Sequence, residues 1–459
     1  MRGKAATGWT TAAWRTSPDD DIGKIGNLRH DTAPRWPTAI TPTMPAMPEN
    51  HPHADAPAPS PAPFSPQDQQ AMAQALALAE QGFGLTEPNP RVGCVIVDAQ
   101  GRLLGSGHTQ QAGGPHAEVM AMRTARAAGH SLIGATAYVT LEPCAHHGRT
   151  PPCADALIEA GLKRVVAAIT DPFPLVAGQG LARLAAAGIQ VEQGLMAEAA
   201  TAINIGFFSR VLRQRPWVRM KVAASLDGRT ALMNGQSQWI TGAAARADGH
   251  AWRRRASAVL TGIGTVLDDD PRLDVRHVPT PRQPMRVVVD APLRTPVTAR
   301  LLAPPGEVLV YTSADETAQA AWLAEVQAAH GARAALGPDG TDVAPPLVQC
   351  VSMPGGPAGK VDLAAMLADL ARRGVNELHV EAGHRLNGSL LREGLVDEFL
   401  VYLAPKLLGL GREMWSWGPL ESLDQAIELE WGDVQSVGGD LRLLARPRGR
   451  LAGWLPGTP

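Results

Sequence analysis

Apolar and polar positions recur along residues 65–212 with the spacings typical of amphipathic helices and half-buried strands. A helix is predicted over 71–81, because Ser65 suits an N-cap, Pro66 the first helical position and Gly82 a helix end. Helices are also predicted to carry His116 and Glu118, to end at Gly161, and to begin near 181. The strands predicted in this half are 92–97, 103–107, 135–141, 165–169 and the end of 181–191.

A second pattern of the same kind begins at Trp217. Arg215-Pro216 marks the boundary between the halves, because proline disfavours helix at the preceding residue, and 204–215 is read as the connection. Such alternation predicts an α/β fold in both halves, and in the first half a mixed sheet with helices on its faces. The strands predicted here are 218–224, 258–261, 285–289, 308–311, 377–380 and 398–403.

Both ends of the chain lack these patterns. Residues 1–64 show no apolar periodicity and are dense in Pro and Ala over 42–63, so they are predicted to be a disordered tail. An alternative is that translation starts at Met44 or Met47, which leaves open whether residues 1–46 are translated. Residues 447–459 are predicted to be a frayed C-terminal tail.

Composition narrows the class of protein. A chain of 459 residues has room for two or three domains, and its formal charge of −2 argues against a nucleic-acid surface. No apolar run reaches the length of a membrane span, and no secretory signal precedes the first helix. Four cysteines are too few for a disulfide framework, and free thiolates suit a reducing cytoplasm, where we expect the protein.

One stretch carries recognisable metal chemistry. His116, Cys144 and Cys153 can supply three ligands to a catalytic Zn²⁺, whose fourth position stays open for water. Glu118 can stay off the metal and carry protons as the catalytic acid and base. His-x-Glu followed by Pro-Cys is typical of zinc deaminases, although eight residues instead of two separate the cysteines here.

With this wide spacing and several other motifs, the chain resembles the bifunctional riboflavin-biosynthesis deaminase/reductase family. The resemblance covers about 65–446 and implies a cytidine-deaminase-like zinc domain over 65–212. It further implies a dihydrofolate-reductase-like NADPH domain over 213–446. The motifs that carry it are Thr86-Glu87-Pro88-Asn89-Pro90-Arg91-Val92-Gly93, His116-Ala117-Glu118, Cys144 to Cys153, Lys221 to Arg229 and Ser237-Gln238-Trp239-Ile240-Thr241.

The resemblance also implies ligand contacts. No Gly-x-Gly-x-x-Gly opens a dinucleotide-binding unit, but a strand runs through Glu381 into a glycine-bearing loop and a helix whose first amides can hold phosphate. Residues expected to bind substrate are Asn89, His146, Arg149, Lys221, Ser237, Leu273, Arg276 and Glu381. Residues expected to bind NADPH are Ala223, Trp239, Thr265, Asp269, Gly383, His384, Arg385, Leu386, Asn387, Gly388 and Ser389.

Several of these residues have plainer interpretations, which the sequence leaves open. Asn89 is otherwise a turn residue, Arg149 a solvated loop charge and Lys221 an edge lysine, while Trp239 and Leu273 are otherwise core residues.

The family implies hydrolytic deamination of 2,5-diamino-6-ribosylamino-4(3H)-pyrimidinone 5′-phosphate, followed by NADPH-dependent reduction of the ribosyl group. The expected partner is thus a small phosphorylated pyrimidine, without nucleic acid or membrane, and homo-oligomerisation is left open. One alternative is a zinc deaminase acting on a tRNA adenosine with a non-catalytic C-terminal binding domain. Another is a deaminase whose second half is a regulatory nucleotide-binding domain.

Overall fold

The computed structural model describes residues 64–146, 151–173, 177–303, 305–330, 335–336, 342–343, 347–355, 359–452 and 454–455. The disorder predicted for residues 1–64 therefore falls, except for Phe64, outside the described residues. The described part of the chain belongs to one compact unit, Pro63–Pro459. Within that part, no helix combines the length and the apolar character that crossing a membrane requires.

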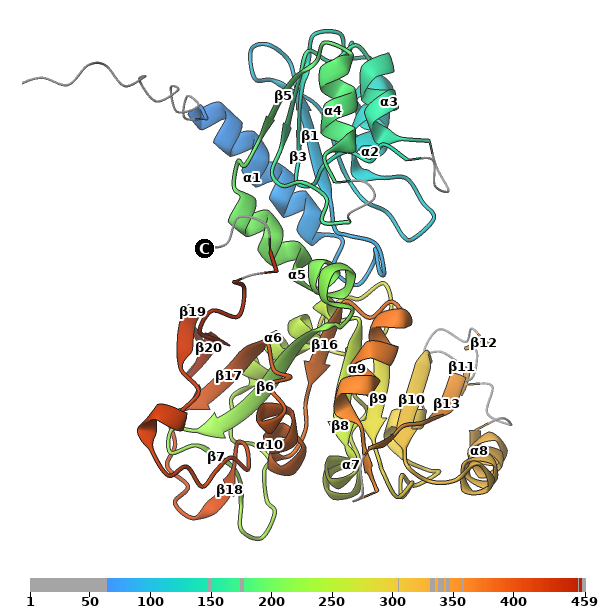
Figure 1. Ribbon diagram of the computed structural model, residues 1–459, viewed down its shortest axis with the longest axis vertical. Helices are drawn as coiled ribbons and strands as arrows, with labels where there is room; N and C mark the ends of the chain where they lie inside the picture. The colour runs from blue at the N-terminus through green and yellow to red at the C-terminus, as the bar shows by residue number, and fades with distance from the viewer. Residues whose placement is uncertain are drawn as a thin grey trace, which may run out of the picture. The chain divides into compact units, whose positions relative to one another are not determined.

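The first half is a five-stranded sheet in the order β2-β1-β3-β4-β5, with helices on both faces (Figure 1). β1 is antiparallel to β2 and β3, whereas β3, β4 and β5 are parallel. Its strands are β1 (Gly93–Val97), β2 (Leu103–His108), β3 (Thr136–Val139), β4 (Arg164–Ala167) and β5 (Gln190–Gln193). Its helices are α1 (Pro66–Glu80), α2 (Ala117–Ala127), α3 (Cys153–Glu159), α4 (Gln179–Ala186) and α5 (Ala197–Arg213).

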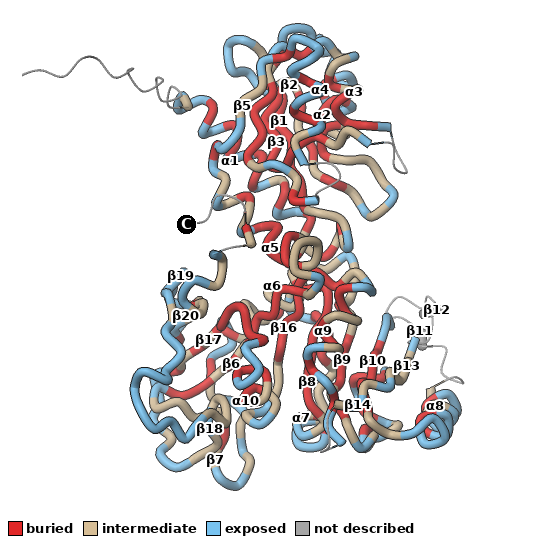
Figure 2. Tube along the Cα trace, viewed as in Figure 1, coloured by how far each residue is buried: buried red, intermediate tan, exposed pale blue. Residues whose placement is uncertain are grey.

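The sequence sets both the start of α1 and the layers of this half. Ser65 and Asp68 form a reciprocal capping box, and Pro66 occupies the first turn, as predicted. Along β1, Cys94 and Ile96 pack with α2, α3 and α4, whereas Val95 and Val97 pack with α1 and α5. Burial follows this pattern and concentrates in the central strands (Figure 2). Both faces of the sheet are therefore covered.

The second half contains a nine-stranded sheet in the order β13-β10-β9-β8-β16-β6-β17-β20-β19. Strands β13 to β17 in this order are parallel, and β20 and β19 extend the sheet as an antiparallel hairpin. The strands are β6 (Trp217–Ser225), β8 (Ala258–Gly262), β9 (Met285–Val289), β10 (Glu307–Thr312), β13 (Leu347–Ser352), β16 (Glu377–Val380), β17 (Glu398–Ala404), β19 (Leu429–Val437) and β20 (Asp440–Pro447). All six strands predicted for this half are present.

Helices cover both faces of this larger sheet. Val287 and Leu309 pack with α9 (Leu363–Arg372) and α10 (His384–Arg392). Val288 and Val310 lie on the opposite face with α7 (Ile263–Asp269) and α8 (Glu316–His330). The remaining helical elements are α6 (Ala243–Arg255) and the 3-10 turns η1 (Arg300–Leu302) and η2 (Leu423–Gln425). Three short antiparallel strand pairs complete the described part of this half: β7 (Arg229–Leu232) with β18 (Gly411–Glu413), β11 (Ala335–Leu336) with β12 (Asp342–Val343), and β14 (Pro354–Gly355) with β15 (Lys360–Val361).

The segment read as a connection at 204–215 is largely the second part of α5, a 17-residue helix. Gly206 lies within it, where glycine costs about 1 kcal/mol relative to alanine. A Cβ at Gly206 would stand 2.4 Å from Cγ of Glu377 and 2.8 Å from the backbone of Asn376. Glycine therefore allows α5 to lie directly against the start of β16.

The prediction of a frayed C-terminal tail is wrong for the described residues after β20. Arg450 Nε donates to Asp397 at 2.6 Å, and Leu455 is buried in the core of the first half. Trp454 packs on Trp217 with ring centroids 6.1 Å apart, and the Arg213 guanidinium lies 4.7 Å from its ring. No periodic pattern is present here, because the few apolar residues pack individually and not as one face of a helix or strand.

The hairpin β19-β20 was also not predicted. Most of β19 is exposed, so its residues lack the alternation of buried and exposed positions that reveals a half-buried strand. Its backbone pairing with β20, and not apolar burial, makes it a strand.

We predict that Trp454→Ala lowers the free energy of unfolding by about 2 kcal/mol, because it removes the ring contact with Trp217 and the cation–π contact with Arg213. Thermal unfolding followed by circular dichroism measures the effect. The matched control is Trp431→Ala, whose side chain is 68% exposed and whose loss should change stability by less than about 0.5 kcal/mol. Equal shifts in the two variants would contradict the packing of the C-terminal segment.

Candidate metal centre and cofactor cavity

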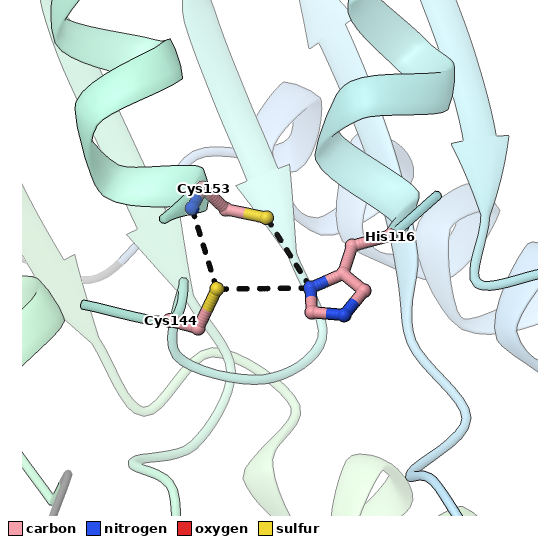
Figure 3. Close-up of side chains that lie close together, drawn as sticks. All are labelled: His116, Cys144 and Cys153. Atoms are coloured by element: carbon pink, nitrogen blue, oxygen red, sulfur yellow. Dashed lines mark hydrogen bonds between the residues drawn. The ribbon is translucent and has the colours of Figure 1, made fainter. Parts of the chain in front are cut away.

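The three predicted metal ligands converge at one point in the first half (Figure 3). His116 Nδ1 lies 3.7 Å from Cys144 Sγ and 3.4 Å from Cys153 Sγ, and all their ligand atoms lie within 4.8 Å of one another. His116 is the N-cap of α2 and not a residue inside it, Cys144 lies in the loop after β3, and Cys153 opens α3. Three chain segments thus supply one soft or borderline donor each.

Only one of the two cysteines ionises readily without a cation. Hydrogen bonding from Cys153, together with the nearby His116, lowers the pKa of Cys144 to about 4. The same hydrogen bond, which the thiolate of Cys144 accepts, and burial raise the pKa of Cys153. Two thiolates this close cannot both ionise alone, whereas a divalent ion between them would stabilise both charges. The donor set of one imidazole and two sulfurs therefore fits zinc.

Glu118 is buried beside this cluster but is not among its ligand atoms. It lies in the first turn of α2 and is only 3% exposed. Burial, with the negative charge of Cys144, raises its pKa to about 7. A carboxyl group that titrates near neutrality can both accept and return a proton, which is the property the sequence analysis required of it.

Glu142, to which the sequence analysis gave no role, fixes the loop that carries Cys144. Its carboxylate accepts hydrogen bonds from the backbone amides of Gly178 and Gly180 at 2.8 Å and of Asp171 at 3.1 Å. Burial, with the charge of Glu142, raises the pKa of Asp171 to about 6. Glu142 stood in the Glu-Pro-Cys motif, but only the fold shows that the start of α4 lies against it.

The residues predicted to contact the substrate in this half differ in their burial, and one of them lies outside the described residues. Asn89 is half-buried in the loop between α1 and β1, where its backbone amide donates to Thr86 O at 2.9 Å. Its side-chain amide makes no hydrogen bond to a described residue, which leaves it free to meet a ligand. His146 is exposed. Arg149 lies outside the described residues, so its predicted phosphate contact stays a prediction.

A cavity of about 1220 Å³ lies in the second half and gathers most of the residues predicted to bind there. Gly388 and Ser389 do not line it, because they lie farther along α10, where Gly388 packs against Ser416 and the Ser389 hydroxyl donates to Arg385 O. The predicted residues that line it are Lys221, Ala223, Ser237, Trp239, Thr265, Asp269, Leu273, Arg276, Glu381, Gly383, His384, Arg385, Leu386 and Asn387.

Glu381 is held by cations within this cavity. Arg253 binds its carboxylate through two nitrogens, one at 2.8 Å, and Lys221 Nζ lies 3.9 Å away. Burial opposes its charge, but Arg253 and Lys221 outweigh that effect and keep the pKa of Glu381 well below its usual range. Arg253 was not predicted, because nothing in the run Arg253-Arg254-Arg255 indicates which arginine faces the cavity.

The loop after α7 presents Leu273 and Arg276 to the cavity with an unusual backbone. Leu273 has φ 53°, a left-handed conformation that a buried leucine rarely adopts and that is found most often at functional sites. The Arg276 guanidinium pairs with Asp274 and stays 42% exposed. Five further arginines that were not predicted also line the cavity: Arg246, Arg272, Arg294, Arg300 and Arg412.

Known proteins match both halves of the chain. Residues 65–169 match the family described as the cytidine and deoxycytidylate deaminase zinc-binding region, and 216–443 match the RibD C-terminal domain. The riboflavin biosynthesis protein RibD of Escherichia coli is 43% identical over 378 residues, covering 80% of this chain and 95% of that protein. RibD of Aquifex aeolicus is 39% identical over 358 residues, with coverages of 78% and 92%.

Solved structures agree with these sequence matches. Acinetobacter baumannii RibD aligns with a TM-score of 0.70 and 41% identity, over 83% of this chain and 99% of that one. The Thermotoga maritima diaminohydroxyphosphoribosylaminopyrimidine deaminase/5-amino-6-(5-phosphoribosylamino)uracil reductase aligns with a TM-score of 0.71 and 32% identity, with the same coverages. The predicted order of a deaminase-like half and a reductase half is confirmed.

We predict that Cys153→Ala loses bound zinc, because two ligands of the cluster remain and the thiolate of Cys144 loses its neighbour. Elemental analysis of the purified protein should fall from about one zinc per chain to near zero. Cys350→Ala is the matched control, since Cys350 lies in β13 and is not part of the cluster. Full zinc content in the Cys153 variant would show that this residue is not a ligand.

Proposed function

The chain belongs to the RibD family of riboflavin biosynthesis, and from this premise we propose a role for each of its two sites. It is a bifunctional enzyme with a deaminase and a reductase activity. We place zinc between His116, Cys144 and Cys153, and NADPH with the phosphorylated sugar in the large cavity of the second half. We also propose that the boundary between the two domains lies between residues 212 and 213, the last two residues of α5.

The observation that carries the deaminase assignment is the position of Glu118. When bound, zinc lowers the pKa of a water molecule toward about 7, so that it attacks as a nucleophile at neutral pH. Glu118 accepts the proton of the water whose oxygen adds to the amino-bearing ring carbon. It then delivers that proton to the departing amino group, so that the carbon–nitrogen bond breaks and ammonia leaves. A carboxylate bound to the metal could not move protons in this way.

The substrate of the first site is a small phosphorylated pyrimidine, as for the family. We assign it as 2,5-diamino-6-ribosylamino-4(3H)-pyrimidinone 5′-phosphate, with Asn89 meeting the pyrimidine ring and His146 and Arg149 meeting the ribose phosphate. The unpaired side-chain amide of Asn89 supports its part of this assignment. A tRNA adenosine is the weaker candidate, because the RibD match extends over the second half, which is a reductase domain and not a nucleic-acid module.

The second site reduces 5-amino-6-(5-phosphoribosylamino)uracil to the ribitylamino product. NADPH supplies the hydride when bound, and the protein contributes position and charge. We place the cofactor against Ala223, Trp239, Thr265, Asp269 and the segment 383–387, where α10 begins and offers free amides to phosphate. Ser237, Leu273 and Arg276 face the substrate, while Arg253 and Lys221 orient Glu381 beside it.

We also propose a cytoplasmic enzyme. Its metal site depends on free cysteines, which a reducing compartment preserves. Homo-oligomerisation remains a prediction that solution measurements of mass can test.

Glu118→Gln should retain zinc and lose deamination by roughly 10³-fold, because the amide cannot carry the proton. Ammonia release and elemental analysis measure the two properties. Reduction of the predeaminated substrate by the same variant serves as the internal control and should continue unchanged. Loss of zinc from this variant would mean that Glu118 is a ligand and that the proton-transfer role is wrong.

Arg276→Ala should raise the KM for the phosphorylated substrate of the reductase by about 10-fold or more, because a charge-assisted contact with phosphate is lost. The affinity for NADPH, measured by fluorescence titration, should stay the same. Arg300→Ala is a control that also removes an arginine of the cavity wall. If the Arg276 variant instead bound NADPH weakly with an unchanged KM for the sugar phosphate, Arg276 would belong to the cofactor site.

A further inference from the structure

The peptide group that joins Pro88 to Asn89 is held from outside its own loop. Arg210 Nη2, from α5, and Asn376 Nδ2, from the residue before β16, each lie 3.1 Å from Pro88 O and donate to it. The side chain of the preceding residue, Glu87, is held as well: its carboxylate accepts from Asn376 Nδ2 at 2.7 Å and from Ser257 Oγ at 2.8 Å. Asn376 and Ser257 both belong to the second half, so the loop of the deaminase domain is fixed by the reductase domain.

Asn376 is enclosed so that its side chain has one orientation. It is 2% exposed, and its Oδ1 accepts from Arg210 Nε at 2.6 Å while its backbone amide donates to Ser257 Oγ at 2.9 Å. With the carbonyl oxygen committed to Arg210, the NH₂ group must point toward Glu87 and Pro88. The side-chain amide of Asn376 therefore bridges α5 and the loop: its oxygen accepts from Arg210, and its nitrogen donates to Glu87 and Pro88.

The neighbouring residue, Glu377, prevents Asn376 from shifting. Its carboxylate is fully buried and accepts from Arg91 at 2.5 Å, from Arg219 at 2.6 Å and from Arg255 at 2.8 Å. Arg91 also donates to Glu87 at 2.6 Å and thus ties the other end of the loop to the same carboxylate. Buried charges are costly to separate from their partners. The start of β16 and the loop are therefore held in fixed positions relative to each other.

We propose that Asn376 is a positioning residue of the deaminase, which orients Asn89 toward the substrate, so that the reductase domain completes the deaminase site. This inference rests on the proposed function, in which Asn89 contacts the pyrimidine ring. It explains why α5 accepts a glycine at 206, where a larger residue would push Asn376 and Glu377 away. Reduction itself does not need Asn376, which does not line the cavity of the second half.

The test measures both activities of the full-length zinc-loaded protein with three variants, Asn89→Ala, Asn376→Ala and the double substitution. Asn376→Ala should raise the KM of deamination about 10-fold, the loss expected for one buried hydrogen-bonding unit, with the KM of the reductase unchanged. If Asn376 acts through Asn89, the double variant should be no worse than Asn89→Ala alone. Arg210→Ala, which removes the second donor to Pro88 O from a partly exposed site, should change the KM in the same direction.

Arg446→Ala is the matched control. Arg446 pairs with Glu398 at 2.9 Å, and Glu398 also binds Arg219, so Arg446 belongs to the same ionic network. It does not contact the loop, so both KM values should stay the same. A fall of both activities together in Asn376→Ala, with unchanged KM values, would reduce the residue to a structural one and overturn the proposal.

Different results would overturn the role of Asn376 and the role of Asn89. An impaired Asn89→Ala with normal Asn376→Ala and Arg210→Ala overturns the positioning role alone. A normal Asn89→Ala overturns the substrate contact of Asn89 in the proposed function, and the positioning role with it.

Discussion

The buried carboxylate of Glu377 lies at the centre of the contacts that link the two halves of this enzyme. Three guanidinium groups surround it, from Arg91 in the first half and from Arg219 and Arg255 in the second. Burial disfavours its charge, yet the three arginines hold the pKa of Glu377 well below its usual range. Removing one member would leave an uncompensated charge in the interior, whereas in the complete set the carboxylate accepts a hydrogen bond from each of the three guanidinium groups. Because buried ion pairs add little net stability, we expect the network mainly to fix how the two halves are joined.

The strand that carries Glu377 also reaches the second active site. β16 is four residues long, with Asn376 and Glu377 at its start and Glu381 directly after its end. One end thus contacts the loop of Asn89, and the other presents a carboxylate to the reductase cavity. β16 pairs with β8 and β6 on its two sides, so its position is fixed by the centre of the sheet. Two chemistries are in this way built on a single short, rigid element.

The fold and the candidate sites could be predicted to different extents. The regular strands were visible because their apolar residues face a covered sheet, as in Val287 and Val288, and the zinc residues because their types and order are rarely combined by chance. The helical part of 204–215, the packing of Trp454 and the pairing of β19 were missed. The contact of Gly206 with Asn376 and Glu377 and the packing of Trp454 on Trp217 join residues far apart in the sequence, so no local pattern reports them. β19 was missed for another reason, because its exposed residues do not alternate with buried ones.

The sequence by itself determined the chemistry: one imidazole, two thiols and a carboxyl group in an order that permits deamination, followed by a reductase motif. Only the tertiary structure decided how these groups are used. In the folded chain Glu118 is buried and is not part of the metal cluster. Arg253, and not the arginines that follow it, binds Glu381, and Asn376 contacts Pro88 although 288 positions separate them in the sequence. The reason is physical: residue type fixes which bonds a group can form, whereas burial and distance, which arise from packing, fix which of them it does form.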